Sequence, residues 1–200
     1  MMNLSKFLTL FFAAALVLTS CSSDDDAPPP VSPEEVITTM IVTLTDGTDQ
    51  VELRFFDEDG ADGPTEPIGT VSGALKASTT YTGSISILNE TEDPAENVNE
   101  EIQEEADEHQ FFYIPTNLGV STTYTDKESD YENAEGEQFP SENPVGLTFS
   151  MTTTADTGDG MLRFVLRHEP NKDAAGVSGG DITNAGGDPD IDWTFNVSVE

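Results

Sequence analysis

The sequence predicts a mainly β fold, an antiparallel β-sandwich with one short peripheral helix. Apolar and polar residues alternate with a period of two in about eight segments of residues 36–200, which is typical of strands with one buried face. Only one segment has a helical period, whereas a parallel sheet would need helices between most of its strands. We therefore expect a single domain of two antiparallel sheets, Ig-like in the broad sense.

The strands are predicted from short alternating runs that are separated by turn residues. They cover residues 36–45, 51–56, 68–75, 79–89, 109–114, 120–125, 145–152, 161–168 and 191–199, of which 68–75 has the weakest pattern. A Thr-Gly-Asp-Gly turn at 157–160 separates two of the clearest runs. We expect the strands on either side of this turn to form a hairpin.

The acidic segment from Glu92 to Glu108 breaks the alternation and predicts the helix. Asp93 is a suitable N-cap, and Pro94 suits the first helical position. Three apolar residues spaced by four form a narrow stripe: Val98, Ile102 and Ala106. We expect about three turns of helix on the outside of the sheets.

Two long polar segments are predicted as surface loops, 126–144 and 169–190. The second contains the glycine-rich stretch Gly176 to Gly187. This stretch is not a phosphate-binding loop, because it lacks the GK[ST] motif and the chain is strongly acidic. We expect it to be a flexible surface loop.

The N-terminus has the pattern of a cleaved export signal. Lys6 precedes an apolar run of about 11 residues, too short to span a bilayer as a helix. Leu18-Thr19-Ser20-Cys21 follows and resembles the bacterial lipobox, which implies acylation of Cys21 and anchoring to a membrane. The alternative is an ordinary secretory signal with a chance cysteine. The predicted organisation is a signal peptide (1–20), an acidic and proline-rich tether (21–35) and one domain (36–200).

Charge and cysteine content exclude several functions. Removal of Lys6 with the signal leaves six basic and 39 acidic residues, a formal charge of −33. This charge repels phosphate backbones, so we expect no nucleic acid partner. Cys21 is the only cysteine, and its acylation leaves no thiol for a disulfide, a thiolate metal site or a cysteine nucleophile.

An acidic stretch, Asp57-Glu58-Asp59-Gly60-Ala61-Asp62-Gly63, is a candidate calcium site. Asp57, Asp59 and Asp62 could surround a hard cation with oxygen ligands, as in calcium loops of the DxDxDG type. The stretch departs from the EF-hand pattern, because Ala61 and Ile68 occupy two of its ligand positions. The alternative is a solvated turn between two strands.

The two histidines of the chain form a second candidate metal site. His109 and His168 each occupy an apolar-face position at the end of a predicted strand, beside Glu108 and Glu169. If these strands pair, the rings could meet and bind copper or zinc with a carboxylate as third ligand. The alternative is a pair of core-edge histidines with ordinary hydrogen-bond partners.

Beyond the lipobox, the chain resembles an uncharacterised family of Bacteroidota lipoproteins. The resemblance lies in the segment from His109 through RHEPNK (167–172) to GDITNAGGDPDIDWTFNV (180–197). Members are sometimes labelled as type 1 periplasmic-binding-fold proteins. That fold has two α/β lobes, whereas the strand pattern here predicts a β-sandwich. The resemblance implies no catalytic residues.

The segment after Cys21 bears on location. Ser22-Ser23-Asp24-Asp25-Asp26 is similar to the export signal of Bacteroidota surface lipoproteins, which implies the outer face of the outer membrane; the periplasmic face is the alternative. We find no GxSxG motif, and no carboxylate pair stands out among 39 acids. The main hypothesis is a surface lipoprotein whose non-enzymatic domain binds an unknown ligand or is structural. The alternative is a periplasmic lipoprotein that binds calcium, copper or zinc.

Overall fold

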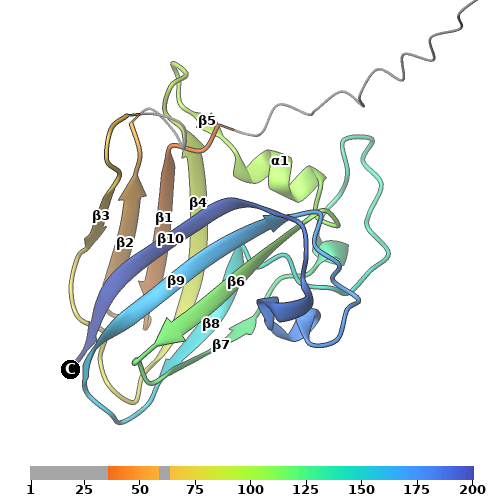
Figure 1. The fold of residues 1–200 in the computed structure, drawn as a ribbon. Helices are drawn as coiled ribbons and strands as arrows, with labels where there is room; N and C mark the ends of the chain where they lie inside the picture. The colour runs from red at the N-terminus through yellow and green to blue at the C-terminus, as the bar shows by residue number, and fades with distance from the viewer. Residues whose placement is uncertain (1–35, 59–63) are drawn as a thin grey trace, which may run out of the picture. The chain divides into compact units, whose positions relative to one another are not determined.

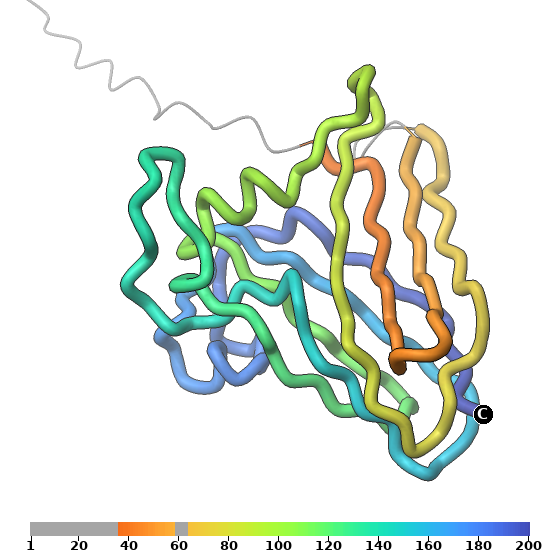
Figure 2. Tube along the Cα trace, turned by 180° about the vertical axis from the view of Figure 1, so that it is seen from behind, coloured from red at the N-terminus to blue at the C-terminus, as the bar shows by residue number. Residues whose placement is uncertain are grey.

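The protein is an antiparallel β-sandwich in the computed structural model, which describes residues 36–58 and 64–200 (Figure 1). The predicted signal peptide, the tether and Cys21 lie outside the described residues. Two sheets face each other. The strands of the smaller sheet cross in front of the larger sheet in Figure 1 and behind it in Figure 2, which is turned by 180°. The predicted fold class is therefore confirmed. No helix among the described residues is long and apolar enough to cross a membrane.

The larger sheet has seven strands in the order β3-β2-β1-β4-β8-β7, with the short β5 paired to β4. Its strands are β1 (Thr39–Thr45), β2 (Gln50–Phe56), β3 (Ile68–Val71), β4 (Thr80–Asn89), β5 (Glu96–Asn97), β7 (Val120–Tyr124) and β8 (Thr148–Thr153). The smaller sheet has the order β10-β9-β6. Its strands are β6 (His109–Thr116), β9 (Gly158–His168) and β10 (Asp188–Val199).

The core lies between the two sheets and is formed by the apolar half of each alternating strand. Met40, Val42 and Leu44 of β1 are fully buried, as are Leu162 and Phe164 of β9. This alternation is the reason that the strands could be placed from the sequence.

Gly83 of β4 pairs with Phe149 of β8. A Cβ at position 83 would lie 2.4 Å from the ring of Phe149, so only glycine fits beneath that ring.

The predicted hairpin between residues 145–152 and 161–168 is wrong. β8 pairs with β4 and β7 in the larger sheet, whereas β9 pairs with β6 and β10 in the smaller one. The chain therefore passes from one sheet to the other between these two strands. Alternation places a strand and its buried face, but it does not select the partner, because both sheets bury the same kind of surface.

The helix is shorter than predicted and begins later. α1 (Asn99–Glu104) has Val98 as its N-cap, so the assignment of Asp93 and Pro94 to the helix start is wrong. Residues 96–97 pair with β4 as β5 instead, and the Asn99 side chain bonds the β4 backbone at both Ile85 and Ile87. Sheet pairing thus overrides the local capping signal. The predicted apolar stripe is correct, since all three of its residues are buried: Val98, Ile102 and Ala106.

The segment after β9 lies at the surface, as predicted, but it has more local structure than a loop. It contains two short 3-10 helices, η2 (Val177–Gly179) and η3 (Ile182–Asn184). Val177 and Ala185 are buried against Phe112 and Val165, which lie on the outer face of the smaller sheet. An apolar outer face must be covered, and this segment covers it. The other long segment, 126–144, contains the 3-10 helix η1 (Glu128–Asp130).

Candidate functional site

The two histidines are in contact, because the ends of the strands that carry them lie side by side. His109 begins β6, His168 ends β9, and the two residues are direct partners in the register of these strands. Their rings stack with centroids 4.7 Å apart and an angle of 10° between the planes. His109 is fully buried, whereas the His168 side chain is 32% exposed. Solvent therefore reaches the pair from the His168 side.

Acidic groups surround the histidine pair. The Nδ1 atom of His109 lies 3.2 Å from the carbonyl oxygen of Glu105, and its Nε2 atom lies 3.7 Å from Asp190 Oδ2. His168 Nε2 lies 3.6 Å from Glu108 Oε2. Burial lowers the pKa of His109 to about 4, so this ring is neutral at pH 7. Burial, with repulsion from neighbouring glutamates, raises the pKa of Glu105.

The histidine pair has ligand atoms close enough for a metal, but the two rings are not oriented to bind one ion. Ligand atoms of Glu105, His109 and His168 all lie within 4.8 Å of one another. An imidazole binds a metal along a lone pair in the plane of its ring, at about 2.0–2.1 Å. Two nearly parallel rings cannot direct such lone pairs at one ion. The partly exposed His168 ring would have to turn before both histidines could bind the same metal.

The candidate calcium site is described only in part. Asp57 follows β2 and is 6% exposed, and its backbone N–H donates to the carbonyl of Thr38 at 2.8 Å. Its Oδ1 atom is buried and has no hydrogen-bond partner among the residues that the structure describes. Asp59 and Asp62 lie outside the described residues. The structure therefore places Asp57 as a mostly buried residue, and the calcium site of the three aspartates stays a prediction.

Asp57 lines a cleft that the sequence did not predict. Two adjoining hollows, of about 460 and 500 Å³, share Phe55 and Pro67 and lie between β3 and β10, the edge strands of the two sheets. We call them together the edge cleft. Its aromatic and acidic walls consist of Phe55, Trp193, Phe195, Asp57, Glu66 and Asp190.

Aromatic packing builds one wall of the edge cleft. The rings of Phe55 and Trp193 stack with centroids 4.1 Å apart, and Phe195 meets Phe55 edge to face at 6.2 Å. Gly69 of β3 faces these rings. A Cβ at that position would lie 3.5 Å from the Phe55 ring and 3.9 Å from Phe195, an ordinary contact distance. The missing side chain of Gly69 therefore leaves this part of the cleft open.

A β-bulge places Asp190 in the cleft. The register between β9 and β10 shifts between Pro189 and Ile191, so Asp190 is the extra residue of β10. A bulge re-aims the side chain of its extra residue, and Asp190 lines the cleft while it also approaches His109. Pro189, two residues before the predicted strand 191–199, is a residue type that sheets tolerate at strand starts and bulges. The cleft itself had weaker signals, namely the single tryptophan in an acidic strand and a glycine in β3.

One acid of the cleft already has a cationic partner. Arg163 donates two hydrogen bonds to Asp192, each at 2.5 Å, and these lower the pKa of Asp192. Neither Asp57 nor Glu66 forms an ion pair with lysine or arginine among the described residues. These two carboxylates, together with Asp190 on the facing strand, line the cleft with acidic groups.

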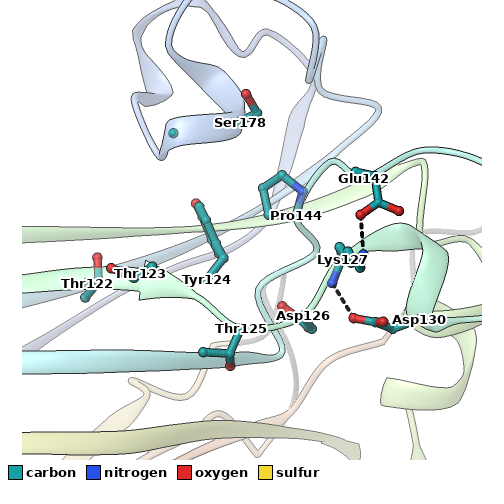
Figure 3. Close-up of a pocket in the computed structure, with 11 residues that line it drawn as sticks. Thr122, Thr123, Tyr124, Thr125, Asp126, Lys127, Asp130, Glu142, Pro144 and Ser178 are labelled. Atoms are coloured by element: carbon teal, nitrogen blue, oxygen red, sulfur yellow. Dashed lines mark hydrogen bonds and ion pairs between the residues drawn. The ribbon is translucent and has the colours of Figure 1, made fainter.

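A second hollow, of about 470 Å³, lies beside β7 and has a different character (Figure 3). Lys127 there forms an ion pair with Glu142, and its backbone N–H donates to Asp130 at 3.1 Å. The hydroxyl group of Tyr124 donates to the carbonyl of Phe111 at 2.6 Å. Because these polar groups already bond one another, the edge cleft is the better candidate for ligand binding.

Comparisons of the chain with protein-family models, with curated proteins and with solved structures found no match. The candidate site is therefore argued from its geometry alone.

Proposed function

We propose that the chain is a lipid-anchored outer-membrane protein, exposed at the cell surface, whose β-sandwich binds a ligand in the edge cleft without catalysis. The observation that carries the binding proposal is Asp57, whose buried carboxylate lies beside an open aromatic wall and has one oxygen without a hydrogen-bond partner among residues 36–58 and 64–200. Burying such a group costs free energy that a bound ligand can compensate. The anchor is supported by Cys21 and the residues before it, which resemble a lipobox.

The anchor is tested by Cys21→Ser. We expect this variant to move from the membrane fraction to the soluble fraction, and we expect the N-terminal peptide of the wild-type protein to carry the mass of acyl chains. Wild-type protein without that added mass would contradict the anchor. Antibody binding to intact cells, before and after replacement of Asp24, Asp25 and Asp26 by alanine, tests surface exposure.

Binding is tested by the thermal unfolding of the full chain in detergent with a panel of calcium, copper, zinc, basic peptides and neutral glycans. A ligand that binds only the folded state raises the melting temperature. Gly69→Leu should abolish the shift by filling the cleft. Gly73→Leu is the matched control, because a Cβ at position 73 meets nothing within 4 Å. A panel that raises no melting temperature would contradict the binding proposal.

A second candidate function is metal binding at the histidine pair, favoured by the closeness of Glu105, His109 and His168. Copper(II) titration with electron paramagnetic resonance would show coupling to two imidazole nitrogens if both rings bind one ion. His168→Gln should remove one of them while the buried His109 remains in place. A spectrum without nitrogen coupling would reject this site and leave the edge cleft unaffected.

A further inference from the structure

We propose that the ligand of the edge cleft is a basic side chain, arginine or lysine, presented by an extended segment of a partner protein. This inference rests on the proposed binding function and specifies the chemistry of the ligand. Three features of the cleft carry it: the buried carboxylate of Asp57, the aromatic wall and the strand edges beside it.

The carboxylates select for positive charge. Asp57 is 94% buried with one oxygen unpartnered among the described residues, and Glu66 and Asp190 line the same hollow. A buried carboxylate is costly unless a cation or hydrogen-bond donors accompany it. Arg163 shows the same recognition on the neighbouring strand, where its guanidinium holds Asp192 through two hydrogen bonds. A basic side chain entering the hollow would give Asp57 the same type of partner.

The aromatic wall suits the apolar part and the flat face of a basic side chain. Trp193 is partly exposed and stacks on Phe55, so the pair presents ring surface to the hollow. Guanidinium and ammonium groups are attracted to the faces of aromatic rings, and tryptophan is the best of these. Arg54 already lies over the ring of Phe56 at 5.1 Å in this molecule.

The strand edges suit an extended segment rather than a free amine. β10 is the outer strand of the smaller sheet, and the cleft follows it from Pro189 to Asn196. Leu75 pairs with β10 only at Val199, so the outer edge of residues 188–197 has no strand partner among the described residues. An extended peptide can add to such an edge through main-chain hydrogen bonds, with side-chain pockets giving specificity. Gly69 leaves room for a second backbone to approach.

A partner protein fits better than a second copy of this chain. The chain has only six basic residues after the signal, and all six lie in the described part. Five form ion pairs with acidic side chains, and Arg167 donates to the carbonyl of Gly187 at 2.9 Å. A copy of the chain would have to break one of these contacts to offer a basic side chain, whereas a basic partner is also drawn by the charge of −32.

Trp193 is the only tryptophan of the chain, so its fluorescence reports directly on the cleft. The probe is a seven-residue peptide of alternating threonine and valine with arginine at its centre. The control peptide has citrulline at that position, which keeps the shape of arginine and removes its charge. With the full chain in detergent, we expect the arginine peptide to change the Trp193 emission and to bind about tenfold or more tightly than the citrulline peptide.

Two variants locate the binding. Asp57→Asn should weaken the arginine peptide to the level of the citrulline peptide, because an amide keeps the shape of the carboxylate but cannot form an ion pair with the guanidinium. Gly69→Leu should abolish the response, whereas Gly73→Leu should keep it. The melting temperature of each free variant is measured as well. Loss of binding in Gly69→Leu at an unchanged melting temperature would place the peptide in the cleft.

Different failures separate this inference from the proposed function. Equal binding of the arginine and citrulline peptides would overturn the choice of a basic ligand. A neutral oligosaccharide that changes the Trp193 emission in a Gly69-dependent way, while the peptides do not, would overturn the inference and support the binding function. An emission that no probe changes would overturn both.

Discussion

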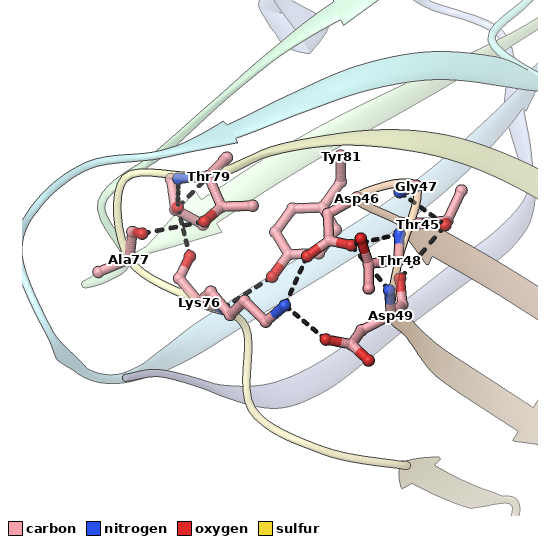
Figure 4. A network of polar contacts seen from close by, with 10 residues as sticks. Thr45, Asp46, Gly47, Thr48, Asp49, Lys76, Ala77, Thr79 and Tyr81 are labelled. Carbon is pink, nitrogen blue, oxygen red and sulfur yellow. Dashed lines mark hydrogen bonds and ion pairs between the residues drawn. The ribbon is translucent and has the colours of Figure 1, made fainter.

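The two ends of the β-sandwich use lysine in opposite ways. Near α1, Lys172 is buried and its Nζ atom contacts Glu128 at 2.9 Å and the carbonyl oxygens of Ala106 and Pro144. At the other end, Lys76 is 51% exposed and bridges Asp46 and Asp49 at 2.7 and 2.6 Å (Figure 4). The distances are similar, but the surroundings differ.

This difference in burial reverses the effect of the protein on each lysine. Burial lowers the pKa of Lys172, and the hydrogen bond to Glu128 only partly offsets this effect. The hydrogen bonds to Asp46 and Asp49 raise the pKa of Lys76. Because this lysine is exposed to water, burial opposes the rise only weakly. A short ion pair therefore says little about stability until the solvent exposure of both partners is known.

The buried pair near α1 also connects separate segments. Lys172 belongs to the segment after β9, Glu128 to η1, and Ala106 to the turn after α1. Next to them, Asp126 is buried and accepts hydrogen bonds from the backbone of Gly146 and Leu147 at 2.9 and 2.8 Å. Loss of one buried charge should thus loosen several elements, whereas the Lys76 contacts join only two turns.

The largest effect is expected from Lys172→Met. Removing the ammonium group leaves Glu128 buried without its ion partner, which costs about 3–5 kcal/mol of unfolding free energy. Denaturant unfolding measures this loss. The double variant Lys172→Met with Glu128→Leu should recover most of it, because the unpaired charge is gone. A double variant as unstable as the single one would show that packing, not charge, makes Lys172 important.

The next effect is the loss of stability in acid that His109 causes. Its folded pKa is about 4 and its unfolded value 6.5, so the unfolded chain binds the extra proton first. Stability should therefore fall as the pH drops from 6.5 to 4, by roughly 3 kcal/mol at most, because Asp190 lies close enough to favour the protonated ring. Melting temperatures of wild type and His109→Gln across this range test it. Equal slopes would assign the acid sensitivity to other groups.

The smallest effect is expected from Lys76→Met. Its ion pairs are exposed, and such pairs contribute little because water and salt compete with them. The melting temperature should change far less than in Lys172→Met, and the small difference from wild type should vanish in 1 M salt. A loss comparable to that of Lys172→Met would remove the distinction between the two ends of the sandwich.

The sequence predicted what local patterns determine. Alternation located the strands and their buried faces, and spacing identified Val98, Ile102 and Ala106 as the buried residues in and beside the helix. It also placed both histidines at strand ends, where the structure finds them stacked. These features depend on residues that are close in the chain, so their signals are short and repeated.

The features that the sequence did not predict depend on contacts between segments that are far apart in the chain. No pattern within β8 or β9 shows that they belong to different sheets, and none links Lys172 to Glu128, 44 positions earlier in the sequence. The edge cleft requires β3 to lie beside β10, and the pocket position of Asp190 requires a bulge. The Asp93-Pro94 capping signal failed for the same reason, because pairing with β4 holds the segment that follows it.

The scarcity of basic residues has a consequence for resistance to trypsin-like proteases. Trypsin-like proteases cleave after lysine or arginine and need several residues around the cleaved bond in an extended, accessible form. Of the six lysines and arginines in residues 36–58 and 64–200, Arg54, Arg163 and Arg167 lie within strands, and Lys172 is buried. Only Lys76 and Lys127 lie in exposed connections, and both are held by acidic partners. The fold therefore offers trypsin few places to begin, although exposed glutamates such as those at 132, 135 and 137 remain open to proteases that cleave after acidic residues.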